Sequence, residues 1–180
     1  MERIAEAVIV PAGPGDAAAL ADVHVRSWRE TYEGLLPAVY LDRMSVQTHA
    51  RRWRHHLTHA AAGEVVLAVE GPRGLIGYCT GALHPLEGAR RQGEIITLYL
   101  LNSAQGLGLG RRLMEMTARA LQAQGASSLI IWALSGNDRA GRFYEHMGGG
   151  VAAQRDVKGW GGGLKETAYY WSDIAIVAGA

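Results

Sequence analysis

Three alternate glycines stand where a predicted strand passes into a predicted helix. They lie in the run Gln105-Gly-Leu-Gly-Leu-Gly-Arg-Arg112, directly after the apolar stretch 94–101. Because glycine has no side chain, the backbone of such a turn can approach a ligand closely, and its N–H groups converge with the positive end of the helix dipole. Arg111 and Arg112 add positive charge beside the turn. The segment therefore predicts a binding site for phosphate oxygens.

The two common nucleotide-binding motifs do not fit this segment. A Walker A loop requires Gly-Lys-Ser/Thr after its last glycine, whereas Arg111-Arg112-Leu113 follows here. The dinucleotide fingerprint requires GxGxxG at the first strand of a βαβαβ half, whereas this chain has GxGxG after its fourth predicted strand. A kinase or a reductase is therefore a weak hypothesis, and a turn that serves only close packing is the structural alternative.

Hydrophobic periodicity predicts the elements that position this turn. Asp16 and Ser45 are predicted N-caps of the first two helices, and a polar loop is expected over 84–92. The predicted order, β-α-α-β-β-β-α-β-α-β-β, gives an α/β fold in one domain, with a mixed, mostly antiparallel sheet of six to seven strands flanked by helices. The predicted strands are 7–10, 64–70, 75–83, 94–101, 128–134, 151–157 and 165–171, and the helices are 16–33, 46–57, the segment from the glycines to Gly125, and 137–147, the last with Ala140, Phe143 and Met147 inward.

Composition narrows the function further. The 180 residues suit one domain with a real core, and 18 basic against 17 acidic residues argue against a dedicated nucleic-acid partner. Cys79 is the only cysteine, so no intrachain disulfide or cysteine-based zinc site can form. The charged N-terminus lacks a signal-peptide core, and no stretch reaches the roughly 18 apolar residues of a membrane span. We expect a soluble, cytoplasmic protein that binds neither nucleic acid nor membrane.

Two motifs together resemble the GNAT N-acetyltransferase superfamily. Gln105–Gly110 fits the signature Q/R-x-x-G-x-G/A, and 137–148 resembles the element N-x-x-A-x-x-F-Y-x-x-x-G. The stretch Trp28–Pro37 resembles the W-R-E-T-Y-x-G-L-L-P segment of a bacterial subfamily. Two positions depart from the pattern: Asn102 replaces a common proline, and Gly149 replaces an aromatic residue that usually follows Gly148.

This resemblance implies a GNAT fold with acetyl-CoA as the donor and a primary amine as the acceptor. It implies that the amides of the glycine turn hold the pyrophosphate, that the fourth strand pairs with the pantetheine arm, and that Asn137 lies beside that arm. The implied cofactor-binding residues are Leu98, Leu100, Gln105, Gly106, Leu107, Gly108, Leu109, Gly110, Arg111, Asn137 and Tyr144. The amide of Leu100 is also the implied hydrogen-bond donor to the acetyl oxygen.

The resemblance also implies two catalytic side chains. Tyr144 matches the position that often protonates the leaving sulfur, and Glu94 has the offset from Gln105 of a general-base glutamate in histone-acetylating members. A partly buried carboxyl group could have its pKa raised enough to accept a proton from an ammonium. The alternatives are a tyrosine that only lines the cleft, and a glutamate that attracts the cationic substrate or is simply exposed. His84 is the alternative base.

The acceptor side is less patterned. Trp28 and Tyr32 correspond to the family's acceptor wall, although aromatic residues one turn apart are usually core residues. Trp160, between glycines at a predicted hairpin tip, is expected to cover the cleft or to meet a partner subunit, which leaves a homodimer open. His55 and His59 have a spacing that can bind zinc, but no glutamate follows His55 and arginines surround the pair, so we expect a solvated face and no metal.

The sequence thus favours an N-acetyltransferase that acts by direct attack in a ternary complex. The main rival hypothesis is a non-catalytic acyl-CoA-binding sensor or scaffold domain with the same fold. The acceptor, a small molecule or a peptide amine, is not specified by any motif.

Overall fold

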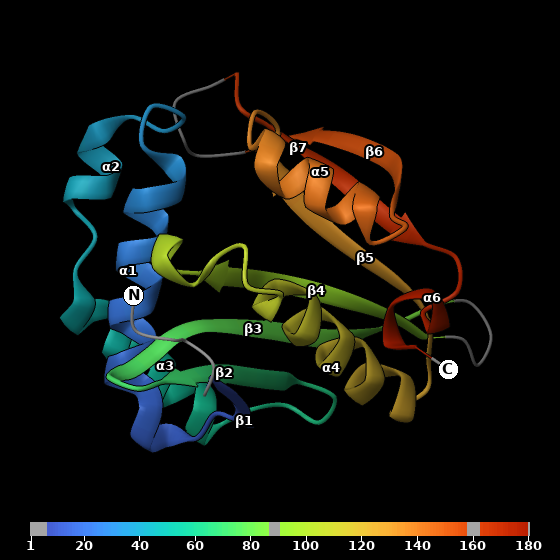
Figure 1. The fold of residues 1–180 in the computed structure, drawn as a ribbon, viewed down its shortest axis with the longest axis horizontal. Coiled ribbons are helices and arrows are strands. Elements are labelled where there is room, and N and C mark those ends of the chain that lie inside the picture. The colour runs from blue at the N-terminus through green and yellow to red at the C-terminus, as the bar shows by residue number, and fades with distance from the viewer. Residues whose placement is uncertain (1–6, 87–90, 158–162, 180) are drawn as a thin grey trace.

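A seven-stranded sheet with the order β1-β2-β3-β4-β5-β7-β6 forms the centre of the molecule (Figure 1). The computed structural model describes residues 7–86, 91–157 and 163–179. The strands are β1 (Val8–Pro11), β2 (Val65–Gly71), β3 (Gly74–Pro85), β4 (Arg91–Leu100), β5 (Ala126–Leu134), β6 (Gly150–Asp156) and β7 (Lys165–Trp171). The helices are α1 (Ala17–Tyr32), α2 (Ala38–Asp42), α3 (Val46–Thr58), α4 (Leu109–Ala123), α5 (Asp138–His146) and α6 (Ala175–Ala178), with 3-10 turns at Pro14–Asp16 and Asn102–Ala104.

The strand directions confirm the predicted mixed, mostly antiparallel sheet. Only β4 and β5, which are connected through α4, run parallel, and the other neighbours are antiparallel. The β4–β5 pairing ends at Ile95 and Ile131, although both strands continue beyond these residues. The two strands therefore separate toward their C-terminal ends and leave a gap in the sheet.

A β-bulge in β4 lies at the start of this gap. Thr80 of β3 opposes Thr97 and the next residue, Gly81, opposes Ile95, so that Ile96 is the extra residue. A bulge of this kind disrupts the ladder locally and changes the direction of the strand. The side chain of Ile96 is 53% exposed.

Helices cover both faces of the sheet and produce two main packing layers. The layer on the α4 face, which also includes residues of α5 and α6, contains Ile95, Leu113 and Leu129 among its buried residues. The layer on the α1 and α3 face contains Leu20 and Tyr78. In Figure 1, α4 and α5 lie in front of the sheet, on either side of the place where β4 and β5 diverge.

The helix starts follow the predictions in part. The Ser45 hydroxyl accepts the Thr48 N–H at 3.3 Å, which confirms Ser45 as the cap of α3. Asp16 occupies the predicted N-cap position of α1, but its side chain makes no capping hydrogen bond to this helix; its carboxylate instead accepts the Gly13 N–H at 2.8 Å and closes the preceding 3-10 turn.

Other predictions need correction at the level of local pairing. The loop expected over 84–92 was wrong at both ends, since Pro85 pairs with Arg91 and His84 with Gln92. Polar side chains do not prevent pairing there because the hairpin needs only backbone hydrogen bonds. The short helices α2 and α6 were not predicted, and the predicted hairpin tip at Trp160 lies outside the described residues.

The buried face of α5 includes Tyr144 in addition to the three residues predicted to point inward. Ala140 and Phe143 are only partly buried at the edge of the core, whereas Tyr144 and Met147 are buried. None of the helices in the described part of the chain has the length and apolarity to cross a bilayer.

Candidate functional site

A cavity of about 690 Å³, here called the central cavity, occupies the gap between β4 and β5. Its wall is formed by the C-terminal turn of α1, the diverging parts of β4 and β5, the glycine turn before α4, and α5. Since α1 and α5 lie on opposite faces of the sheet, the cavity passes through the sheet. A donor and an acceptor could therefore enter from different faces and meet in the middle.

The glycine turn forms one end of the central cavity. Gly106 and Gly108 have φ angles of +76° and +77°, a conformation that glycine adopts at little cost, and no other atom lies within 4 Å of where a Cβ would be. Gly108 is also the N-cap of α4 and has no side chain to cap it. The first N–H groups of a helix have no acceptor within the helix. The turn thus presents an open concave surface with N–H donors, as phosphate binding requires.

Five residues of the turn line the cavity, and the two leucines between its glycines do not. Gln105, Gly106, Gly108, Gly110 and Arg111 line it. By contrast, Leu107 is exposed at 52%, and Leu109 is buried in the core, where it fixes the start of α4. Any part that Leu107 and Leu109 play in binding is therefore limited to their backbone.

The backbone of β4 faces the gap at alternate residues. The Leu101 N–H donates to the Ile76 carbonyl at 3.0 Å, and in an antiparallel ladder the residues bonded to one neighbour alternate with those directed away from it. Leu98 and Leu100 therefore direct their backbone groups away from β3, toward the separated β5. The Gln105 side-chain amide donates to the Leu100 carbonyl at 2.9 Å and joins the glycine turn to the end of this strand.

Tyr144 reaches the cavity from α5 and is only 5% exposed. Helix α5 lies very close to β7: a Cβ added at Gly141 would be only 2.6 Å from the Tyr169 hydroxyl, so glycine permits this approach. Burial raises the pKa of Tyr144 well above its ordinary value of 10.0, so the phenol stays protonated at neutral pH. The site therefore holds a neutral hydroxyl donor.

Asn137 and Tyr32 also line the cavity. The Asn137 side-chain oxygen accepts the Ala140 N–H at 3.2 Å and caps α5, so that this residue links the helix to the cavity wall. The hydroxyl groups of Tyr32 and Tyr99 are 2.9 Å apart, and burial raises the pKa of both phenols. Trp28 does not line the cavity but packs beside these rings, with its centroid 5.0 Å from that of Tyr32.

Glu94 is not brought to the central cavity. Its carboxylate lies 2.7 Å from Nε2 of His84, and neither residue is part of the cavity wall. The two candidate bases from the sequence are thus paired with each other, near the N-terminal end of β4 and before the bulge.

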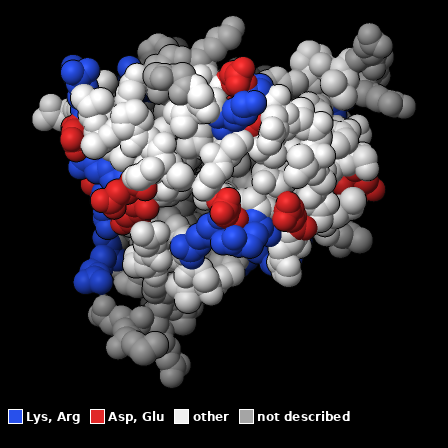
Figure 2. Space-filling view, turned by 90° about the horizontal axis from the view of Figure 1, so that it is seen from above, with Lys and Arg blue, Asp and Glu red and all other residues white. Residues whose placement is uncertain are grey.

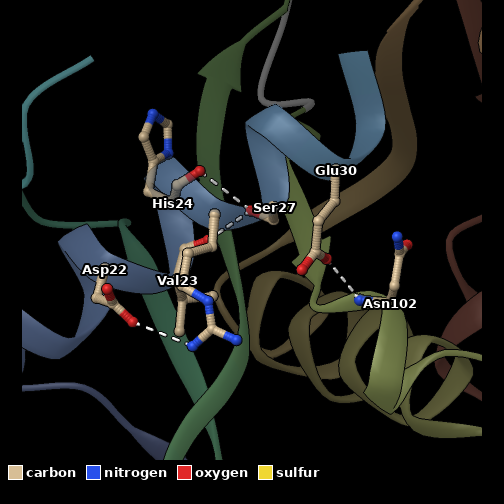
Figure 3. A network of polar contacts seen from close by, with 7 residues as sticks. Asp22, Val23, His24, Ser27, Glu30 and Asn102 are labelled. Atoms are coloured by element: carbon tan, nitrogen blue, oxygen red, sulfur yellow. Dashed lines mark hydrogen bonds and ion pairs between the residues drawn. The ribbon is translucent and has the colours of Figure 1, made fainter. Parts of the chain in front are cut away.

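Glu30, at the C-terminal end of α1, is the carboxylate on the described wall of the cavity, and the sequence analysis missed it. Figure 3 shows its side chain extending to the backbone of Asn102, whose N–H donates to Glu30 Oε2 at 2.7 Å. A proline at 102 could not donate this bond. The departure from the family pattern at Asn102 therefore permits a contact between α1 and the segment that leads into the glycine turn. The signal in the sequence was the position of Glu30 within Trp28–Pro37.

The two histidines with the zinc-type spacing, His55 in α3 and His59 just after it, lie against each other. His55 and His59 stack with ring centroids 4.4 Å apart, and His59 Nδ1 lies 2.9 Å from the His55 carbonyl oxygen. Within 7–86, 91–157 and 163–179, no group of three or more His, Cys, Asp or Glu side chains is arranged to hold a metal ion.

A mixed sheet that opens between two parallel strands beside a phosphate-type turn is typical of an acyltransferase. Comparison with known proteins identifies the family of this chain. The model of the acetyltransferase (GNAT) family matches residues 20–149, and the chain belongs to this family. It is 28% identical over 158 residues to the uncharacterized N-acetyltransferase YuaI of Bacillus subtilis (strain 168), covering 88% of each chain.

Two solved structures show the same fold. The PaiA N-acetyltransferase from Thermoplasma acidophilum, in complex with coenzyme A, superposes with a TM-score of 0.73 at 17% identity, covering 92% of this chain and 98% of that one. YncA from Salmonella typhimurium, a putative acetyltransferase with its cofactor acetyl-CoA, has a TM-score of 0.67 at 22% identity, covering 92% and 93%.

Proposed function

We propose that this protein transfers the acetyl group of acetyl-CoA to a primary amine by direct attack in a ternary complex. The observation that carries the proposal is the central cavity, which passes through the sheet and brings a phosphate-type turn, free strand backbone and a protonated tyrosine to one space. The proposal is supported by the family and by the coenzyme A complexes of structural neighbours.

Donor binding is assigned to the glycine turn and β4. The amides from Gln105 to Gly110 would hold the pyrophosphate, and Arg111 at the cavity wall would add positive charge. The pantetheine arm would lie along β4, where Leu98 and Leu100 direct their backbone groups into the gap. Asn137 would flank the arm from the N-terminus of α5.

The chemical step needs no covalent enzyme intermediate. The neutral amine nitrogen attacks the thioester carbonyl carbon, and the Leu100 N–H would stabilise the oxygen that gains negative charge. When the C–S bond breaks, the sulfur would receive the Tyr144 proton, and the amine gives up one proton to a base. The sole cysteine is unsuited as a nucleophile, since burial raises the pKa of Cys79 to about 12.

The positions of two carboxylates suggest different roles for them in acceptor binding and in proton transfer. Glu30 lies on the wall of the central cavity, where its negative charge would attract a cationic acceptor. Glu94 lies outside the wall and could act only through an intervening group, such as a water molecule. We therefore propose Glu30 for acceptor attraction and retain Glu94 as the more remote candidate for proton transfer.

The face drawn in Figure 2 offers no extended basic area for a polyanionic partner. On the face drawn in Figure 2, basic and acidic side chains are interspersed, with no broad area of a single sign. This agrees with the formal net charge of +1. A small-molecule or peptide amine is the acceptor class that we propose.

The test is acetyl-CoA-dependent release of free thiol across a panel of amines, combined with calorimetric binding of acetyl-CoA. We expect Tyr144→Phe to lower turnover by about 10²-fold or more, with donor affinity nearly unchanged, because only the hydroxyl is removed. Full activity of the variant would remove the proposed role of Tyr144. Binding of acetyl-CoA without turnover on any amine would favour a sensor or scaffold, and no binding would refute the proposal.

A further inference from the structure

A second cavity, of about 270 Å³ and here called the side cavity, adjoins the central cavity on the face covered by α1 and α3. Its wall includes residues of both helices and of β2, β3 and β4. Ile96 and Thr97, at the bulge of β4, line both cavities. The bulge is therefore the ridge between them.

Flat, uncharged rings form much of the side cavity. Trp53 and Tyr78 pack edge to face with centroids 5.2 Å apart, and the rings of His24 and His49 are 4.5 Å apart. The Tyr78 hydroxyl is 2.6 Å from His24 Nδ1. Burial lowers the pKa of His24 to about 4 and raises that of Tyr78, so both are neutral at pH 7 and the phenol donates to the imidazole. Such walls suit a planar ring.

Glu64 places an acceptor for a hydrogen bond in the same cavity. Its buried Oε2 atom accepts no hydrogen bond from the described residues, but it lies 3.4 Å from His56 Nε2, an ion pair when that histidine is protonated. Because the Glu64 side chain as a whole is 26% exposed, its carboxylate keeps an accessible part that can accept a hydrogen bond from a ligand in the cavity. The other charged side chain on the wall is Arg52, which is exposed.

The route of the acceptor connects these observations. The glycine turn at the start of α4 places the donor's phosphates on the α4 side, so an acceptor must approach the acetyl group from elsewhere. The side cavity opens on the opposite face of the sheet and meets the central cavity at Ile96 and Thr97. Its volume is slightly below the roughly 300 Å³ at which small-molecule sites begin, which suits a single ring system rather than a peptide.

We propose that the side cavity holds the head of the acceptor, a planar ring with an N–H donor, whose short alkyl chain carries the primary amine over the Ile96 ridge to the acetyl group. This inference rests on the proposed acetyltransferase function. Glu64 accepts the ring N–H, and the partly exposed rings of Trp53, His24 and His49 contact its faces and edges. Acceptor preference is thus determined by α1, α3 and β2, away from the residues that bind the donor.

Three amines separate the contributions to this preference. Tryptamine has a ring with an N–H, 2-phenylethylamine has a ring without one, and butylamine has no ring. We expect kcat/KM to fall in that order. Replacement of Glu64 by Ala should lower kcat/KM for tryptamine by about 10-fold and leave that for 2-phenylethylamine nearly unchanged, because only tryptamine can donate to the carboxylate.

Glu70→Ala is the matched control, since Glu70 is an exposed glutamate on β2, the strand that begins just after Glu64, and lines neither cavity. Equal use of tryptamine and butylamine, with no effect of Glu64→Ala, would overturn the inference while leaving the acetyltransferase function intact. If no amine releases thiol, the proposed function fails, and calorimetric titration of tryptamine into the CoA-bound protein then decides. Binding that Glu64→Ala weakens would support the side cavity as a ligand site, and absence of binding would refute it.

Discussion

Replacement of Gly108 by Ala tests the phosphate-binding role of the glycine turn with a single methyl group. Gly108 has a φ angle of +77°, and the added Cβ would meet no protein atom within 4 Å. The cost to the fold is therefore conformational, about 1–2 kcal/mol for a left-handed non-glycine residue, which corresponds to a fall in Tm of roughly 2–8 °C for a chain of this size.

Ligand affinity should change for a separate reason. The methyl group would project into open space where we place the pyrophosphate, and the displaced phosphate would lose hydrogen bonds from backbone N–H groups. Hydrogen bonds to charged groups contribute about 1.5–3 kcal/mol each, so the loss of one should weaken acetyl-CoA binding about 10- to 100-fold. Calorimetric titration with acetyl-CoA, and with a pantetheine fragment that lacks the pyrophosphate, would measure this effect.

Gly34→Ala is the control for strain alone. Gly34 also has a φ of +77° and open space around its Cβ position, and it does not line the central cavity. Both variants should lose similar stability, but only Gly108→Ala should bind acetyl-CoA more weakly, and neither should change pantetheine binding. Equal acetyl-CoA affinity in the two variants would refute the assignment of the turn to phosphate.

Three further predictions concern other parts of the site. Asn102→Pro removes the N–H that donates to Glu30 at 2.7 Å, and we expect a loss of about 1–2 kcal/mol in the free energy of unfolding, measured by denaturant titration; unchanged stability would show that the contact is not formed. Glu30→Gln should raise the KM of a cationic amine, whereas Glu94→Gln should change kcat and its pH profile if Glu94 accepts a proton through water; steady-state kinetics of both variants would show the reverse pattern if the roles are exchanged. Because the pKa of His24 is about 4 when folded and 6.5 when unfolded, the unfolded state binds more protons between these values, so stability should fall by about 2 kcal/mol from pH 7.5 to pH 4.5 through this group; a His24→Gln variant with the same pH dependence in denaturant titrations would contradict this cause.

The family and the fold could be predicted from local sequence because their signals are short-range. Alternate glycines before an amphipathic stretch indicate a phosphate-type turn whatever lies beyond it. The Ser45 cap likewise depends on residues within one helical turn, and the structure confirms it with the bond to Thr48. Most strands are one apolar run each, so their order along the chain was sufficient to predict a mixed sheet.

The assembly of the site depends on features that no local pattern reports. The separation of β4 from β5 and the bulge at Ile96 result from pairing between distant strands. The bulge in particular alters the direction of β4. The offset of Glu94 from Gln105 in the sequence therefore did not indicate that Glu94 pairs with His84 outside the cavity. Glu30 reaches the site only because α1 ends beside Asn102, which follows it by 72 positions in the chain.

The two departures from the family pattern are compensated within the structure. At Gly149, where an aromatic residue is usual, a Cβ would lie 2.6 Å from the ring of Trp171, and the Trp171 indole donates to the Met147 carbonyl at 2.9 Å. The aromatic group beneath α5 is thus supplied by β7 rather than by the residue after Gly148. At Asn102 the lost rigidity of proline is replaced by the bond to Glu30. In both places a tertiary contact thus holds a position where the sequence departs from the motif, Trp171 beneath α5 and Glu30 beside the segment that leads into the glycine turn.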